Sequence, residues 1–304
     1  MTTRLVLSMK HKKKIINYLK VAGKIVLSSA ILWYISSRID IAAIQSAIGQ
    51  ANVFWLIAAL LAYAVSQVAA SFRLNTLFRL MPVRISQWTN MKLYWLGLFY
   101  NLFLPGGVGG DGFKVYLLNH YLYVPVKRSL GAIFADRLSG LTIIVTYLLI
   151  LLHFIDYPLP FEWLFWLAIP LPLVVLFFFM RWVLPRFLRA FRAISLWSLL
   201  VQGIQMLAAV FILYALGADN SGGYDDYLFL FFLSAIMASI PVTLGGIGAR
   251  ELTFLMGAEY LDLQQDMAVA LSLLFFLVSV VSALPGLWFT IRPRKILKEY
   301  SEKS

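Results

Sequence analysis

The sequence predicts an all-α integral membrane protein in which six full transmembrane helices and two re-entrant helical hairpins form an inverted repeat. Three observations lead to this fold class. Hydrophobic residues make up 61% of the 304 residues and charged residues only 13%, a composition that excludes an ordinary soluble protein. Several apolar segments reach the length of about 20 residues that crosses a bilayer as a helix. Two glycine-rich clusters interrupt the apolar sequence at widely separated positions.

Six apolar segments are long enough to cross the hydrocarbon layer, which is about 30 Å thick. A helix rises about 1.5 Å per residue, so each segment crosses the layer once. The predicted spans are residues 16–37, 52–72, 129–153, 162–184, 194–217 and 267–291.

Two further apolar regions predict helical hairpins rather than single spans. Residues 88–124 are interrupted by Pro105 and the first glycine cluster, and residues 227–261 by Pro241 and the second. The pieces on either side of each interruption are too short to cross alone. Unpaired backbone groups are costly in hydrocarbon, so an interruption at membrane depth is buried in protein or lines a polar cavity. We therefore expect the two clusters to mark the functional centre.

The distribution of charge predicts the orientation of the chain. The net charge is +12, but the basic residues gather in alternate loops between apolar segments. Membrane orientation explains this pattern and argues against nucleic-acid binding. With the N-terminus in the cytosol, the inside loops are basic and the outside loops acidic, with Arg38 as the only outside base. Both termini are then cytosolic.

The same layout divides the chain into two halves, residues 1–158 and 159–304. Each half holds two spans, a hairpin and one more span, which is an odd number of full crossings. The second half therefore runs upside down relative to the first, as in transporters with inverted repeats. We expect the hairpin of the first half to open to the cytosol and that of the second half to open to the outside.

The two glycine clusters correspond position for position over four residues. Each precedes a short helix whose free N–H groups and positive dipole end suit a phosphate or another anion. Tight helix packing is the alternative explanation of the glycines. The candidate substrate-binding glycines are Gly106, Gly107, Gly109, Gly245, Gly246 and Gly248.

Charged residues within the membrane segments are the second group of candidates, because each costs a few kcal/mol unless it is paired or faces water. Arg137 and Arg250 each carry a permanently charged guanidinium group, whose N–H donors suit the oxygens of a phosphate. Asp111 can pair with Lys114 three residues on. The alternative explanation of Asp111 and of Glu251 is that each simply stabilises a helix start. Arg73 ends the second predicted span, where snorkelling to the surface is the favoured explanation. The candidate charged residues are Arg73, Asp111, Lys114, Asp136, Arg137, Arg250 and Glu251.

No metal, cofactor or catalytic site is predicted. The chain has no cysteine, and its three histidines are scattered, without carboxylates at a spacing that would hold a metal. Residues 107–112 match the dinucleotide pattern G-x-G-x-x-G, but an apolar membrane helix precedes them where that fold requires a strand.

Three motifs in order resemble the lysylphosphatidylglycerol synthase transmembrane-region family, also called flippase-like proteins. They are the segment from Asn101 to Asp111, the triplet Asp136-Arg137-Leu138 and the segment from Pro241 to Glu251. Arg73 is similar to the arginine that follows the second span in this family. The resemblance covers nearly the whole chain.

The resemblance implies a lipid flippase of the bacterial inner membrane, whose substrate is a phospholipid, aminoacylated or not, or a polyprenyl-phosphate-linked lipid. The aminoacyl-transferase domain of bifunctional members does not occur in this sequence, so we do not expect an enzyme. Two alternatives stay open: an integral-membrane enzyme acting on lipid phosphate, such as a polyprenyl diphosphate phosphatase, and a scaffold for a lipid-modifying enzyme. A homodimer is also left open.

Overall fold

The computed structural model describes residues 41–82, 84–103, 109–155, 162–218, 223–240 and 248–291, together with Val26, Ser29, Trp33, Tyr34 and Ser37. Every regular element in these residues is helical, and they contain no strand, so the predicted all-α class holds there. The elements are α2 Ile41–Gly49, α3 Val53–Phe78, α4 Gln87–Phe103, α5 Gly109–Leu122, α6 Val126–Leu151, α7 Glu162–Ala168, α8 Leu171–Trp182, the 3-10 helix η1 Pro185–Ala190, α9 Phe191–Ala215, α10 Tyr224–Ser239, α11 Ala249–Tyr260, α12 Gln265–Ala283 and α13 Pro285–Ile291.

Five stretches of the described chain are long and apolar enough to cross a membrane. They are Val53–Phe78, Val126–Leu151, Trp163–Trp182, Pro185–Ala215 and Gln265–Ile291. Each overlaps one predicted span. The remaining predicted span, residues 16–37, lies outside the described residues apart from the five isolated positions named above. The chain is a multi-pass membrane protein.

Proline and capping residues set several of the boundaries. Asn52 caps α3, because its Oδ1 accepts a hydrogen bond from the N–H of Phe54 at 2.9 Å. Pro170 separates α7 from α8, and Pro185 opens the 3-10 turn that leads into α9. One departure from the prediction bears on the site: α3 continues to Phe78 instead of ending at residue 72. Arg73 therefore lies inside a helix rather than at its end.

The arms of both predicted hairpins are short helices that pack in pairs. The 17 residues of α4 and the 12 residues of α11 rise only about 25 and 18 Å, less than the bilayer thickness. The helices α4 and α5 contact each other, and so do α10 and α11. The turns that join them, residues 104–108 and 241–247, lie outside the described residues.

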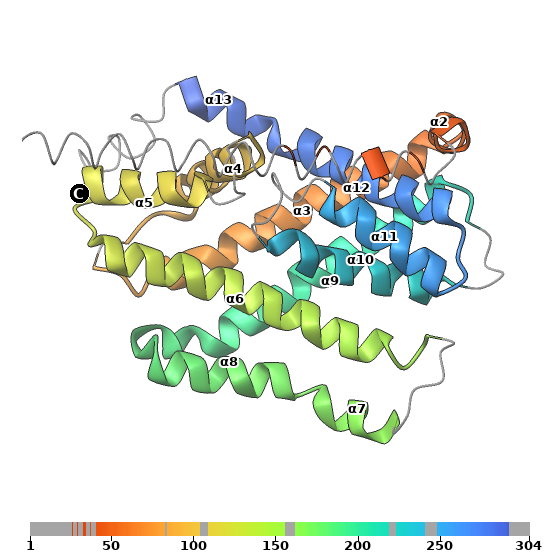
Figure 1. Cartoon of the computed structure of the whole chain (residues 1–304). Helices are drawn as coiled ribbons and strands as arrows, with labels where there is room; N and C mark the ends of the chain where they lie inside the picture. The colour runs from red at the N-terminus through yellow and green to blue at the C-terminus, as the bar shows by residue number, and fades with distance from the viewer. Residues whose placement is uncertain are drawn as a thin grey trace, which may run out of the picture.

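Two large apolar cores hold the bundle together, and α3 and α9, which pack along each other, contribute side chains to both (Figure 1). One core gathers side chains of α3 to α6 with η1 and α9, including Phe78, Leu93 and Leu117. The other joins α9 to α12, including Phe232 and Phe254. Many large apolar side chains remain exposed, as expected for surfaces that face lipid.

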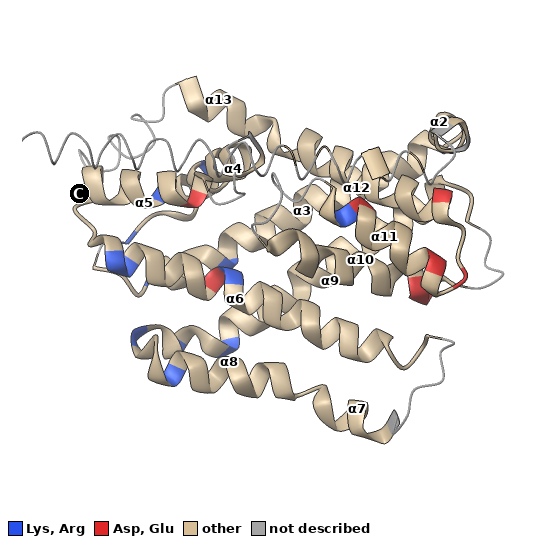
Figure 2. Ribbon diagram, in the orientation of Figure 1, with Lys and Arg blue, Asp and Glu red and all other residues tan. Residues whose placement is uncertain are grey.

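Charge differs between the two ends of the bundle (Figure 2). Lys127 and Arg128 lie at the start of α6, on the side where α8 turns into α9, and we call this the basic end. The opposite, acidic end carries Asp225, Asp226, Glu259, Asp262 and Asp266. The pair α4 and α5 lies toward the basic end, and the pair α10 and α11 toward the acidic end (Figure 1). This separation has the form that the positive-inside rule describes.

Candidate functional site

The first helix pair is held together by an unusually close backbone approach. A Cβ atom on Gly110 would lie 1.9 Å from the carbonyl oxygen of Gly97, so neither α5 nor α4 has room for a side chain there. The N–H of Gly110 donates to Oδ1 of Asn101 at 2.8 Å, which satisfies one free group at the start of α5. At this glycine the packing explanation is correct.

Asp111, in the first turn of α5, binds two cations. Its Oδ1 accepts a hydrogen bond from Nζ of Lys114 at 3.1 Å, and its Oδ2 accepts one from Nε of Arg137 on α6. Lys114 is buried, and its stem passes over Gly97, where a Cβ atom would lie 2.0 Å from Cε. Its ammonium group lies 4.8 Å from the centre of the Tyr94 ring. The predicted pairing of Asp111 with Lys114 is confirmed.

Arg73 and Asp136 form a buried bidentate ion pair between α3 and α6. The distances are 2.7 Å from Nε to Oδ1 and 3.1 Å from Nη2 to Oδ2. Nη1 of Arg73 also donates to Oγ of Ser198 on α9 at 3.0 Å, and that hydroxyl donates to Oγ of Ser139 at 3.0 Å. The snorkelling explanation of Arg73 is therefore wrong, because the longer α3 directs its side chain into the bundle.

These residues form one charge cluster, which we define as Arg73, Asp111, Lys114, Asp136 and Arg137. Adjacent Asp136 and Arg137 have separate partners on α3 and α5, because neighbouring residues of a helix point in different directions, about 100° apart. Three cations and two anions leave one net positive charge. Asp136 lies ten residues into α6, about 15 Å along the helix from its basic end, and α6 is long and apolar enough to cross a membrane.

Arg137 is the member of the cluster that reaches the surface. Its side chain is 45% exposed, whereas those of Arg73 and Lys114 are buried. A guanidinium exposed at this depth requires a polar neighbour, either water in a cavity or the headgroup of a lipid. The guanidinium of Arg137 can therefore contact a ligand, whereas the other charged groups of the cluster are buried and paired with one another.

Glu251 stabilises the start of α11, which belongs to the second helix pair. Its Oε2 accepts the N–H of Gly248 at 2.7 Å, and its Oε1 accepts a hydrogen bond from Oγ of Ser272 on α12 at 3.5 Å. Gly248 has a φ of +86°, a conformation that favours glycine. The helix-start explanation of Glu251 is thus correct, and the described residues show no ion pair between it and Arg250.

Arg250 lies beside the same helix start. Its guanidinium is 5.8 Å from the centre of the Phe275 ring, and Phe275 contacts Tyr63 of α3 edge to face at 5.3 Å. Nε of Arg250 is buried and has no hydrogen-bond partner within the described part of the chain. Tyr63 and Arg73 are ten residues apart on α3, or about 15 Å, so Arg250 and the charge cluster occupy different depths.

The glycine site predicted from the sequence is described only in part. Gly109 begins α5 and Gly248 precedes α11, but Gly106, Gly107, Gly245 and Gly246 lie outside the described residues. Binding of an anion by backbone N–H groups at the two turns stays a prediction.

Sequence reasoning missed the polar residues that support the cluster. Tyr94, Gly97 and Ser198 carry no pattern that distinguishes them in an apolar segment, and Asn101 begins the first family motif but was not among the candidate site residues. Ser139 donates to the carbonyl oxygen of Asp136 at 2.8 Å and accepts from Ser198, so it is a further polar support of the cluster. The described residues hold no group of three or more metal-ligating side chains.

A family model for the lysylphosphatidylglycerol synthase TM region matches residues 21–286, which include both helix pairs and the whole charge cluster. The chain belongs to this family. The resemblance seen in the three motifs is therefore confirmed. The matched range contains every candidate site residue of this chain.

Curated relatives have similar sequences over part of their length. Phosphatidylglycerol lysyltransferase of Staphylococcus aureus strain COL is 26% identical over 191 residues, which are 59% of this chain and 22% of that protein. The protein of the same name from strain MRSA252 is 26% identical over 196 residues, with the same coverage. The match thus takes in about a fifth of the length of these curated relatives.

Proposed function

We propose that this protein is a lipid transporter that moves a phospholipid or a polyprenyl-phosphate-linked lipid between the leaflets of the bacterial plasma membrane, without chemical change. The observation that carries the proposal is the charge cluster on the membrane-spanning helices α3 and α6, with one net positive charge and a half-exposed Arg137. Such groups are stable in a membrane only when they are paired or face a polar ligand.

A lipid phosphate complements this cluster. A phosphodiester carries one negative charge, which balances the net charge of the cluster, and arginine binds its oxygens in a fork. The start of α5 adds a positive dipole end beside Asp111. Asp111 and Asp136 hold the cationic side chains in place, so that the phosphate meets a preformed site.

The two helix pairs supply the path. We propose that they are re-entrant hairpins of an inverted repeat, one opening at each end of the bundle, with glycine turns that converge at mid-depth. The charge cluster then receives the headgroup from the basic, cytosolic side, and Arg250 provides a second position on the acidic side. The names of the relatives support a phosphatidylglycerol-like substrate.

The test is exchange of a fluorescent phosphatidylglycerol between the leaflets of liposomes that hold the purified protein. We expect Arg137→Gln to lower the exchange rate about tenfold or more, because it removes a charge-assisted contact. Asp111 keeps Lys114 as a partner, so the variant still folds. Arg181→Gln is the matched control, since Arg181 is exposed at the end of α8 outside the cluster.

Two results would count against the proposal. Wild-type exchange rates in Arg137→Gln would remove the cluster from the path. Release of inorganic phosphate from a lipid diphosphate by the purified protein, without exchange, would favour the alternative of a membrane enzyme.

A further inference from the structure

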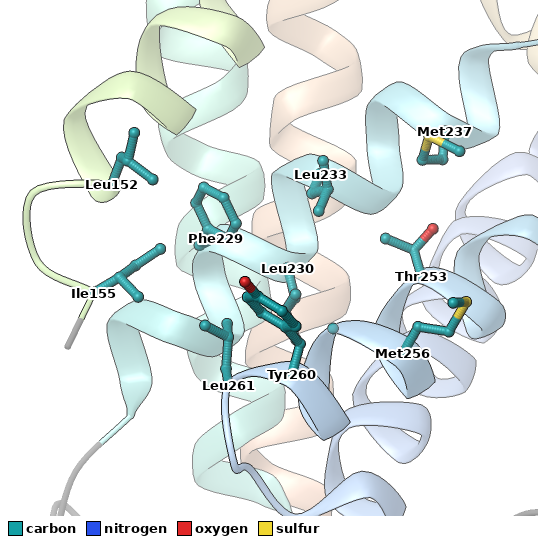
Figure 3. Close-up of a pocket in the computed structure, with 11 residues that line it drawn as sticks. Leu152, Ile155, Phe229, Leu230, Leu233, Met237, Thr253, Met256, Tyr260 and Leu261 are labelled. Carbon is teal, nitrogen blue, oxygen red and sulfur yellow. The ribbon is translucent and has the colours of Figure 1, made fainter. Parts of the chain in front are cut away.

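A cavity of about 540 Å³ lies between α10, α11 and the end of α6, away from the charge cluster. Figure 3 shows the side chains that converge on it from these three segments. Its lining includes Leu152 and Ile155 after α6, Phe229 and Leu233 on α10, and Met256 and Leu261 on α11. We call this cavity the α10–α11 groove.

The groove offers almost no polar group to a ligand. Thr253 lines it, but its hydroxyl donates to the carbonyl oxygen of Ala249 at 2.7 Å. Met237 and Met256 are flexible, polarizable side chains that adapt to irregular apolar ligands. An apolar cavity of this kind is not stabilised by water, which needs two or more polar partners.

Gly257 shapes the floor of the groove. A Cβ atom there would lie 2.2 Å from Cδ2 of Leu230, so the glycine lets α11 pack directly against α10. The two helices leave the remaining space open on the side toward the end of α6.

The length and position of the groove match one leaflet. The lining runs from Phe229 to Met237 on α10 and from Thr253 to Leu261 on α11, each about 12 Å of helix. Half of the hydrocarbon layer measures about 15 Å. Leu261 lies beside the acidic end, whereas Met237 and Thr253 are the lining residues nearest the turn between the two helices. Tyr260, 68% exposed, lines the groove beside Leu261, at the end of the groove nearest the acidic end of the bundle.

We propose that the α10–α11 groove binds one acyl chain of the transported lipid in the leaflet at the acidic end. This inference rests on the proposed function, and it adds a site for the apolar part of the substrate. Flexible methionines and an almost wholly apolar lining can accept the hydrocarbon chain of a lipid whatever its headgroup. The chain lies along the second helix pair, which brings the headgroup toward the start of α11 and Arg250.

The test fills the groove without touching the charged residues. Met256 is 56% exposed on the groove side, and Met256→Trp places an indole where the acyl chain would lie. Val175 on α8 is 59% exposed on a lipid-facing surface, and Val175→Trp is the matched control. Native mass spectrometry of protein released from phosphatidylglycerol nanodiscs counts the lipid molecules that remain bound.

We expect wild type and Val175→Trp to retain one lipid that Met256→Trp loses, with about tenfold weaker retention or more, since each displaced methylene group contributes to affinity. Leaflet exchange in liposomes should fall in Met256→Trp alone. Equal retention in all three proteins, or lost retention with unchanged exchange, would overturn the groove as a substrate site. Absence of exchange by the wild type would contradict the proposed function, while retention would still decide whether an acyl chain occupies the groove.

Discussion

At the scale of single residues, the ion pair of Arg73 and Asp136 is the clearest case of charge buried within the bundle. Both oxygens of the carboxylate are used, and the third guanidinium nitrogen donates to Ser198. The pair joins α3 to α6, and Ser198 adds α9. Burying two charges is costly, and the attraction between them repays the cost only while both are present. The pair therefore specifies how three helices meet.

Removing one partner should destabilise the protein strongly. We expect Arg73→Leu or Asp136→Leu to lower the free energy of unfolding by about 3–5 kcal/mol, because the remaining charge is left unpaired. The double variant should recover most of this loss. Thermal unfolding in detergent micelles measures all three variants. Single variants as stable as wild type would show that the remaining charge finds another partner.

At the scale of elements, the first helix pair depends on one glycine contact. Gly110 lies against the backbone of Gly97, and Lys114 reaches Asp111 by crossing the same glycine. Close packing and ion pairing therefore share one contact surface. A displacement of α5 from α4 would move Asp111 away from Arg137 on α6.

Adding one methyl group tests this contact. Gly110→Ala should destabilise by about 1–3 kcal/mol, because a Cβ atom there meets backbone rather than a flexible side chain. Gly112→Ala is the matched control on the same helix: a Cβ there has nothing within 4 Å, and alanine favours a helix by about 1 kcal/mol. Unfolding temperatures that fall equally in both variants would refute the packing argument.

At the scale of the whole molecule, hydropathy predicted all five spans of the described residues and both pairs of short helices. Both features depend on length and apolar content, which are local properties of the sequence. The pairing of Asp111 with Lys114 was also predictable from their spacing on one helix. Arg73 was placed wrongly because apolar character weakens after residue 72 while helix α3 continues. Its partner Asp136 is 63 positions away, and the sequence pattern holds no information on which helices meet. The α10–α11 groove left no signal, since its lining resembles any lipid-facing surface.

The opposed openings of the two helix pairs can be tested by labelling from each side of the membrane. The chain has no cysteine, so single cysteines report without background. Lys127→Cys and Glu259→Cys are exposed references for the basic and acidic ends. Gly112→Cys, near the start of α5, should react with an impermeant maleimide only in inside-out vesicles, together with Lys127→Cys.

Ala249→Cys, at the start of α11, should react only in intact cells, together with Glu259→Cys. The starts of α5 and α11 follow the turns of the two proposed hairpins, which we place at mid-depth. Labelling of either helix start therefore requires an aqueous opening on the expected side. Reaction of both helix starts from one side would contradict the inverted repeat. It would leave the charge cluster and Arg250 in a single cavity, and transport would then need a different conformational change.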